Sequence, residues 1–188
     1  MKKQFIVITG PTCGGKTTLK ETLLSLSGDA LAEVVTTTTR RPRPGESNCK
    51  AYRFCTKARF ARMVRDGKLL EWVRYDGHYY GIELDALEAV RVSDADGVAV
   101  VTVEGLAALE AWCAQSDVQI IRVLATAPAD ELLRRFECRQ DADDVATRRR
   151  RETLAREVER TIELSRFDWI VDPMMSRALM DLAAAKHA

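Results

Sequence analysis

The chain has almost no net charge and no long hydrophobic run. Its 188 residues include 29 Lys and Arg against 28 Asp and Glu, which gives a formal charge of +1 at pH 7. This nearly equal number of positive and negative side chains argues against nucleic acid or a membrane surface as the main partner. The apolar runs are short, such as residues 98–101, so we expect no membrane-spanning segment. The apolar stretch near the N-terminus lacks a cleavage-like site, and we expect no signal peptide.

Cysteines are few, and their spacing suggests no pairing. The five lie at positions 13, 49, 55, 113 and 138, and no two form a C-x-x-C pair. An odd number without such pairs argues against a disulfide framework and against a zinc site. We therefore expect reduced thiols in a cytoplasmic protein. The length and the apolar content of 46% fit one α/β domain with small inserted parts.

A glycine-rich segment follows the first apolar run. Residues 10–17 read G-P-T-C-G-G-K-T, which matches the P-loop pattern G-x-x-x-x-G-K-[ST] between a strand and a helix. Glycines let backbone N–H groups approach phosphate oxygens, and the following helix directs its positive end at the same anion. Lys16 supplies a charge for the β- and γ-phosphates, and the Thr17 hydroxyl a ligand for Mg²⁺. The predicted ATP-binding residues are Gly10, Pro11, Thr12, Cys13, Gly14, Gly15, Lys16, Thr17 and Thr18.

The rest of the chain alternates between helical and strand patterns. We expect strands over 34–39, 97–103, 118–125 and 167–171, and helices over 57–66, 84–92, 105–114, 129–137, 145–165 and 176–186. This alternation predicts a parallel sheet flanked by helices. Residues 40–46 contain two prolines and a glycine, which favour a basic loop over a helix or a central strand. The segment from about 52 to 84 is predicted to be a small β-rich insertion.

Three motifs stand in order at close spacing. They are the P-loop, the loop T-T-T-R-R-P-R-P-G-E at 37–46, and a Glu71-Trp72 pair followed by G-H-Y-Y-G at 77–81. This constellation resembles guanylate kinase, and the resemblance runs from Phe5 to about Asp172. It implies a P-loop nucleoside monophosphate kinase that transfers a phosphoryl group from ATP·Mg²⁺ to GMP or dGMP.

The resemblance also implies how the chain is divided. Such kinases have a three-layer core with a parallel sheet, a monophosphate-binding insertion and a helical lid that carries arginines. Here the core is expected at 1–33, 84–138 and 149–188, the insertion at 34–83 and the lid at 139–148. Either a monomer or a homodimer is compatible with the sequence.

The resemblance assigns the acceptor phosphate to four side chains. A monophosphate carries about two negative charges, so its site needs fixed cations and hydrogen-bond donors. Arg40 and Arg43 lie on the proline-stiffened loop and can donate bidentate hydrogen bonds. Tyr52 and Tyr80 can donate their hydroxyl groups to the same phosphate.

Glu71 is the predicted reader of the base. Guanine presents two adjacent donors, N1–H and the N2 amino group, and an ionised carboxylate accepts from both. Adenine lacks the N1–H, so its binding would leave the carboxylate without a partner. By resemblance, Thr36 takes the place of a serine whose hydroxyl contacts O6.

Three positions depart from the family pattern. Ile82 replaces a second serine beside the base. Thr102 replaces an aspartate that organises Mg²⁺ through water, and Glu104 takes the place of an aspartate that contacts the guanine amino group. An apolar Ile82 beside the base could admit another nucleobase.

The lid segment supplies arginines for the transition state. Mobile arginines that arrive on closure stabilise the charge that spreads over the transferring phosphoryl group. The resemblance assigns this role to Arg139 and to one residue of 148–151, with Arg150 favoured over Arg149. The predicted catalytic residues are Lys16, Arg43, Arg139 and Arg150.

Two alternatives to a guanylate kinase stay open from the sequence. One is a (deoxy)nucleoside monophosphate kinase with altered base choice, which the substitutions Ile82 and Thr102 motivate. The other is a non-catalytic guanylate-kinase-like domain that binds a partner peptide. Such domains usually have a degraded P-loop, whereas Gly15, Lys16 and Thr17 are intact here.

Overall fold

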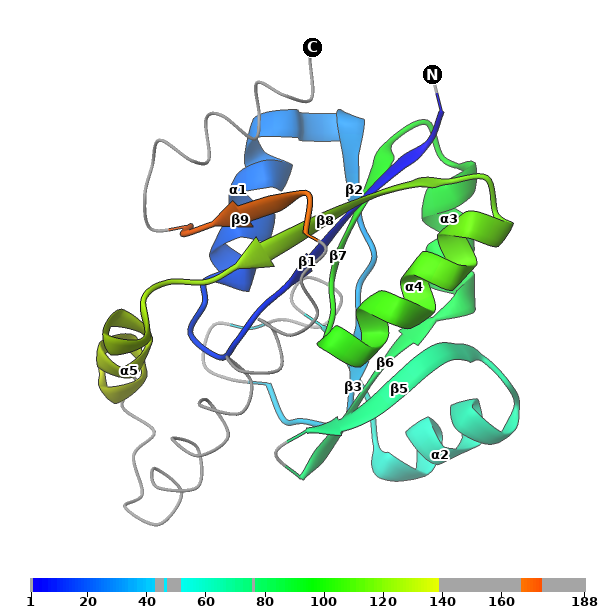
Figure 1. Ribbon diagram of the computed structural model, residues 1–188. Helices are drawn as coiled ribbons and strands as arrows, with labels where there is room; N and C mark the ends of the chain where they lie inside the picture. The colour runs from blue at the N-terminus through cyan, green and yellow to red at the C-terminus, as the bar shows by residue number, and fades with distance from the viewer. Residues whose placement is uncertain (1, 43–45, 47–51, 76, 139–166, 174–188) are drawn as a thin grey trace. The chain divides into compact units, whose positions relative to one another are not determined.

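The computed structural model of the protein describes residues 2–42, 46, 52–75, 77–138 and 167–173 (Figure 1). The described residues form two compact units. One contains the described residues within 1–6 and 29–120, and the other contains those within 7–28 and 121–188. The boundary passes along β1 (Gln4–Thr9) and β8 (Gln119–Ala125). Each unit is described by itself.

A five-stranded sheet has the order β2-β7-β1-β8-β9. Its other strands are β2 (Leu31–Glu33), β7 (Asp96–Val100) and β9 (Trp169–Val171). β2 pairs with β7 in parallel, and β8 pairs with β9 in parallel. In β1, every residue from Phe5 to Thr9 is buried, as expected for a central strand covered on both faces. The predicted α/β class with a parallel sheet is confirmed.

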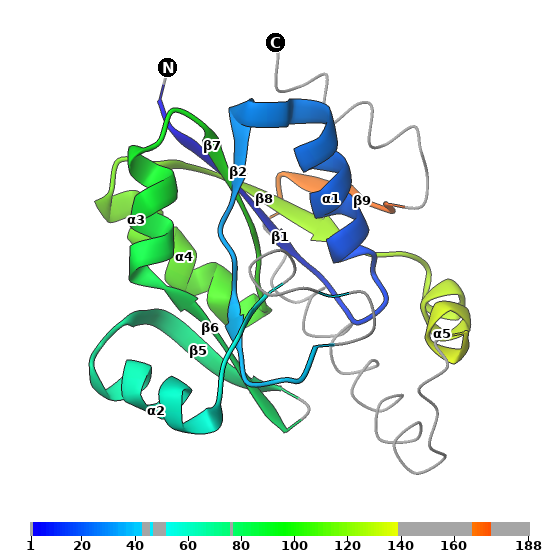
Figure 2. The ribbon, with the colours of Figure 1, turned by 180° about the vertical axis from the view of Figure 1, so that it is seen from behind.

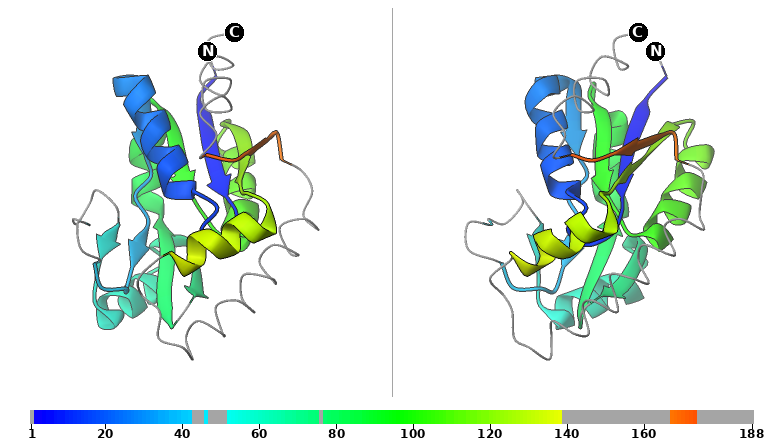
Figure 3. Two further views of the ribbon diagram at one scale, coloured as in Figure 1. Left: turned by 90° about the vertical axis from the view of Figure 1, so that its left-hand side faces the viewer. Right: turned by 60° about the vertical axis from the view of Figure 1, so that its left-hand side comes forward.

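Five helices accompany the strands among the described residues. They are α1 (Lys16–Ser27), α2 (Lys57–Arg65), α3 (Leu84–Val92), α4 (Val103–Gln115) and α5 (Ala129–Glu137), and a short 3₁₀ turn covers Gly28–Ala30. Figure 3 shows the loop that joins β1 to α1, and α5 in the segment after β8. The predicted helices over 57–66, 84–92 and 129–137 are confirmed to within a residue. Those predicted over 145–165 and 176–186 lie outside the described residues. No helix in the described part of the chain is both long and apolar enough to cross a membrane.

The unit that contains residues 29–120 also carries a second sheet, of order β4-β3-β6-β5. Its strands are β3 (Thr37–Thr38), β4 (Arg53–Phe54), β5 (Leu69–Tyr75) and β6 (His78–Glu83). β5 and β6 form an antiparallel hairpin, and α2 lies beside it (Figure 2). Phe60 of α2 is 2% exposed. This β-rich segment falls within the predicted insertion.

The strand predicted over 34–39 is wrong in its extent. The structure has strand β2 before it and strand β3 inside it, and the two belong to different sheets. Val34 still donates its N–H to the carbonyl of Val98, while the carbonyl of Thr36 already accepts from Arg53. The β-branched run favours an extended chain, but this chain crosses from one sheet to the other between these two hydrogen bonds.

The boundary between β7 and α4 also differs from the prediction. The expected strand continued to 103 and the expected helix began at 105, whereas β7 ends at Val100 and α4 begins at Val103. The reason is local. The hydroxyl of Thr102 accepts a hydrogen bond from the N–H of Gly105 at 3.1 Å and caps the helix. A threonine placed after an apolar strand was therefore a helix start signal that the apolar pattern concealed.

Candidate active site

The phosphate loop follows the last residue of β1 directly. Gly14 donates its N–H to the carbonyl of Pro11 at 3.0 Å, which closes the turn. The Lys16 ammonium donates to the carbonyls of Gly10 and Pro11 at 2.7 and 2.9 Å. These bonds hold the lysine along the inside of the loop, where its charge is available to an incoming phosphate.

Close packing requires glycine at two points of the loop. A Cβ on Gly10 would lie 2.0 Å from the carbonyl oxygen of Ala125, and a Cβ on Gly14 would lie 2.4 Å from the same atom. Cys13 adopts a φ of 64°, a left-handed conformation that is uncommon for residues other than glycine, asparagine and aspartate. Its side chain is 7% exposed, and all four described cysteines, Cys13 among them, are free thiols.

The N-terminus of α1 is prepared to receive an anion. Its N-cap is Gly15, which supplies no side-chain acceptor, and its first turn contains no acidic residue. The first N–H groups of a helix lack partners within the helix and carry its positive dipole end. Other helices in the protein are capped differently. For example, Thr56 accepts a hydrogen bond at the start of α2, and α5 has two acidic residues in its first turn. An anion in the loop would therefore meet the N–H groups of this first turn.

Arg135 and Asp172 form an ion pair in the same unit as the loop. Arg135 donates to the two oxygens of Asp172 at 3.0 and 3.2 Å and to Glu131 at 2.7 Å. Hydrogen bonds from Arg134 and Arg135 lower the pKa of Glu131 to about 2. The next residue, Pro173, lies where a Cβ on Gly15 would be, at 2.9 Å from its Cγ atom. The segment after β9 thus borders the phosphate loop.

Three of the predicted phosphate ligands meet in the other unit. The Arg40 guanidinium lies over the ring of Tyr52, 5.2 Å from its centroid, and the ring of Tyr80 lies 6.0 Å from that of Tyr52. Arg40 also donates two hydrogen bonds to the Glu46 carboxylate, at 2.8 and 2.9 Å. Burial opposes the charged form of Arg40, but the hydrogen bond and the charge of Glu46 outweigh it and raise the pKa. The arginine is therefore fixed in position and always charged.

Glu71 lies on β5 of the same unit, half-buried. Burial, followed by the negative charge of Glu104, raises the pKa of the Glu71 carboxyl to about 7. Glu104 lies in the first turn of α4 and is exposed. The sequence predicts that both carboxyl groups contact the guanine base. The structure brings them close enough for the charge of Glu104 to affect the pKa of Glu71.

The two remaining predicted base contacts are placed differently. Thr36 is half-buried, and its hydroxyl donates to the carbonyl of Val100 at 3.4 Å. Ile82 lies opposite Glu71 in the β5–β6 register, but its side chain is only 1% exposed. Ile82 therefore offers almost no surface to a ligand, and the apolar side chain belongs to the core of this unit.

Three predicted catalytic residues lie outside the described part of the chain. These are Arg43, Arg139 and Arg150, together with the whole predicted lid at 139–148.

Two residues near the site went unassigned in the sequence analysis. Glu46 belongs to the quoted loop motif, and its pairing with Arg40 could have been suspected from the charges. Gly105 gave no such signal, although a Cβ on it would lie 2.8 Å from a carboxylate oxygen of Glu71. Only the fold brings the first turn of α4 against β5.

Comparison with known proteins identifies the family. A family model described as guanylate kinase matches residues 2–185. The chain belongs to the guanylate kinase family.

Two individual guanylate kinases match this chain over most of their length. The chain is 32% identical over 156 residues to a guanylate kinase of Rubrobacter xylanophilus, covering 82% of this chain and 79% of that one. It is 30% identical over 185 residues to a guanylate kinase of Schizosaccharomyces pombe, covering 98% and 90%. The crystal structure of guanylate kinase from Anaplasma phagocytophilum superimposes with a TM-score of 0.69 at 21% identity, over 99% and 83% of the two chains, which supports the fold.

Proposed function

We propose that this protein transfers the γ-phosphoryl group of ATP to GMP or dGMP, giving ADP and GDP or dGDP. The observation that carries the proposal is the cluster of Arg40, Tyr52 and Tyr80 in the unit that also contains the half-buried Glu71. One part of this set suits a dianionic phosphate and the other suits the donor edge of guanine. Membership of the guanylate kinase family supports the same reaction.

ATP is proposed to bind on the loop from Gly10 to Thr17, with Thr18 beside it. The N–H groups at the start of α1 and the Lys16 ammonium stabilise its phosphates. Because the acceptor phosphate is already largely ionised near pH 7, it attacks the γ-phosphorus without a general base. The rate then depends on positioning and on charge stabilisation.

Mg²⁺ fits the donor set of the phosphate loop. The Thr17 hydroxyl is a hard oxygen ligand in the exposed first turn of α1. Within the described ranges no three His, Cys, Asp or Glu side chains gather to hold a metal by themselves. In P-loop enzymes the Ser or Thr of the loop is a ligand of Mg²⁺ alongside phosphate oxygens. When bound, the ion neutralises charge on the β- and γ-phosphates.

The acceptor is proposed to be clamped by its phosphate and read by its base. Arg40 and Arg43 with Tyr52 and Tyr80 hold the phosphate, and Glu71 accepts from N1–H and the amino group. Thr36, Ile82 and Glu104 complete the surroundings of the base, with Ile82 acting through packing. The insertion at 34–83 and the lid at 139–148, with Arg139 and Arg150, close over the substrates. We place this activity in the cytoplasm, because the five cysteines of the sequence are odd in number and form no C-x-x-C pair.

The test is an ADP-release assay with ATP·Mg²⁺ and a panel of GMP, dGMP, AMP, dTMP, UMP and CMP. We expect turnover with GMP and dGMP and at least about a hundredfold lower kcat/KM for the others. Turnover of a different base at a rate above that of GMP would overturn the proposed base choice. No turnover with any acceptor, despite thermal stabilisation by ATP·Mg²⁺, would contradict the proposed reaction.

The affinity for GMP is expected to rise with pH through neutrality. Glu71 has a pKa of about 7 in the free protein and accepts both guanine donors only when ionised. KM for GMP should therefore fall as the pH is raised from about 6 to about 8. The GMP phosphate itself ionises near pH 6. The Glu71→Gln variant, measured in parallel, should show only this phosphate step and should lose the step near pH 7.

Gly105→Ala should weaken GMP binding through Glu71. The added methyl group would lie 2.8 Å from the Glu71 carboxylate, which is the flexible end of a side chain and can move away. Alanine favours the helix, so α4 should still form. We expect KM for GMP to rise roughly tenfold or more, with KM for ATP unchanged. In a Glu71→Gln background the same substitution should add little, and full additivity would contradict an action through Glu71.

A further inference from the structure

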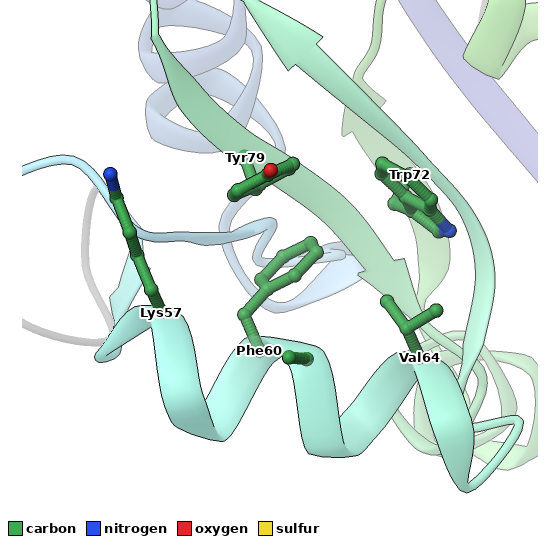
Figure 4. A pocket seen from close by; sticks show the side chains of 6 residues that line it. Lys57, Phe60, Val64, Trp72 and Tyr79 are labelled. Atoms are coloured by element: carbon green, nitrogen blue, oxygen red, sulfur yellow. The ribbon is translucent and has the colours of Figure 1, made fainter.

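A groove lies between α2 and the β5–β6 hairpin. Its volume is about 340 Å³, and Figure 4 shows the side chains that line it. The lining residues are Lys57, Phe60, Ala61, Val64, Trp72 and Tyr79. All of them belong to one unit of the protein. The groove contains no residue that the proposed reaction uses.

Helix periodicity builds one wall of the groove. The four lining residues of α2 follow the spacing i, i+3, i+4 and i+7, which places them on one stripe of the helix. The hairpin supplies the other wall. The ring of Tyr79 stacks on that of Phe60 at 5.5 Å and meets that of Trp72 edge-on at 5.7 Å. Phe60, Trp72 and Tyr79 form an aromatic floor, in which the Tyr79 ring is held between the other two rings.

The groove and the base-reading carboxylate lie on opposite faces of the hairpin. Successive residues of a strand point to opposite faces, so Trp72 faces away from Glu71, and Tyr79 faces away from Tyr80. A molecule in the groove would therefore leave the predicted acceptor residues of this unit uncovered.

The groove is apolar inside and positively charged around it. Trp72 is 46% exposed, which is unusual for a large aromatic side chain. Of the four basic residues of α2, Lys57 lines the groove, whereas Arg62 lies on the opposite side of the helix and pairs with Asp66 at 3.8 Å. Arg74 lies on the face of Trp72, opposite Tyr79 in the register. Neither Lys57 nor Arg74 makes an ion pair with any other described residue.

We propose that this groove docks a short acidic peptide segment of another protein through one bulky apolar side chain. The side chain would lie on the rings of Phe60, Trp72 and Tyr79, and flanking carboxylates would pair with Lys57 and Arg74. Exposed aromatic residues flanked by cations suit such a segment, because the apolar anchor supplies affinity and the charges supply orientation. A partner bound there would leave the cluster of Arg40, Tyr52 and Tyr80 accessible to GMP.

The binding test uses fluorescein-labelled random copolymers of glutamate and tyrosine, followed by anisotropy. We expect saturable binding that weakens as salt is raised from about 50 to about 500 mM. Polyglutamate, which lacks the apolar anchor, and a lysine–tyrosine copolymer, which has the opposite charge, should bind at least tenfold more weakly. Equal binding of polyglutamate would overturn the proposed role of the aromatic floor.

Two sets of variants locate the site. Trp72→Ala and the double variant Lys57→Glu/Arg74→Glu should each weaken copolymer binding at least tenfold. Arg62→Glu is the matched control, because it reverses one charge on the opposite side of the same helix and should leave binding within twofold. Unchanged thermal midpoints and unchanged kcat for GMP show that these variants are folded.

Competition with nucleotide tests whether the copolymer binds instead at the cationic residues proposed for the nucleotide phosphates. Saturating GMP should leave the copolymer affinity unchanged, because GMP is expected at the opposite face of the hairpin. Displacement of the copolymer by GMP or ATP would show that copolymer and nucleotide share one site, and it would overturn the proposal. Failure of the protein to phosphorylate GMP would not bear on the result with Trp72→Ala.

Discussion

Lys16→Met should abolish phosphoryl transfer, with kcat/KM for ATP reduced by about a thousandfold. The Lys16 ammonium is held by the carbonyls of Gly10 and Pro11, inside the loop that is proposed to carry the β- and γ-phosphates. Methionine keeps the length and the apolar stem of the side chain but loses the charge. The charge that develops on the transferring phosphoryl group would then lack a fixed partner, while the loop itself keeps its glycines.

The matched control for this variant is Lys57→Met. Lys57 is the first residue of α2, as Lys16 is the first residue of α1, and it lies away from the phosphate loop in the sequence. We expect normal kcat for Lys57→Met and thermal midpoints for both variants within a few degrees of the unsubstituted protein. A Lys16→Met protein that retains more than a tenth of the activity would contradict the role given to the lysine.

Glu71→Gln should have the second large effect, on the acceptor side. The amide offers one acceptor and one donor group where guanine needs two acceptors, so one hydrogen bond is lost and a donor faces a donor. We expect kcat/KM for GMP to fall by about a thousandfold, with KM for ATP unchanged. Glu21→Gln, an exposed change in α1, is the control and should leave both constants unaltered.

The same variant should be more stable than the unsubstituted protein above neutral pH. Burial and the charge of Glu104 raise the pKa of Glu71 from its ordinary value of 4.5 to about 7. Between these two values the folded protein binds more protons than the unfolded chain, so the free energy of unfolding falls as pH rises. Above about pH 7 the whole penalty is present, and glutamine removes it.

Thermal unfolding at two pH values checks this expectation. At about pH 8 the midpoint of Glu71→Gln should exceed that of the unsubstituted protein by about 3 °C. Towards pH 5 the difference should shrink, because the folded protein then holds Glu71 in its neutral form. A lower midpoint at pH 8 would show that the carboxylate stabilises the fold, contrary to the assigned cause of its raised pKa. If Glu71→Gln loses GMP turnover and gains stability, Glu71 serves recognition of guanine at a cost in stability.

The phosphate loop is a part of the structure that neighbouring residues in the sequence suffice to predict. Strand β1, the loop and α1 follow one another within a few residues, so glycine placement, helix start and lysine position are all set by neighbours in the chain. For the same reason the helices α2, α3 and α5 begin where their patterns predict. The prediction failed where one apolar or β-branched run serves two elements, as at residues 34–39 and at the junction of β7 with α4.

The base site illustrates the opposite case. The motifs name Arg40, Tyr52, Glu71 and Tyr80 one by one, and the resemblance supplies their roles. That the Arg40 guanidinium lies over the Tyr52 ring, and is held there by Glu46, follows only from the folded sheet of β3 to β6. The burial of Ile82 at 1% exposure is also a result of packing, and it changes the meaning of a substitution that the sequence alone presents as a ligand contact.

The sequence by itself determined the class of the fold, the phosphate loop and the family, because each depends on short-range patterns of glycine, charge and apolar residues. The tertiary structure decided the electrostatics of Glu71 and the presence of the groove beside Trp72. Both depend on contacts between segments that are distant in the chain. Gly105 and Glu104 reach Glu71 only because α4 packs on β5, and the groove exists only because α2 lies beside the hairpin.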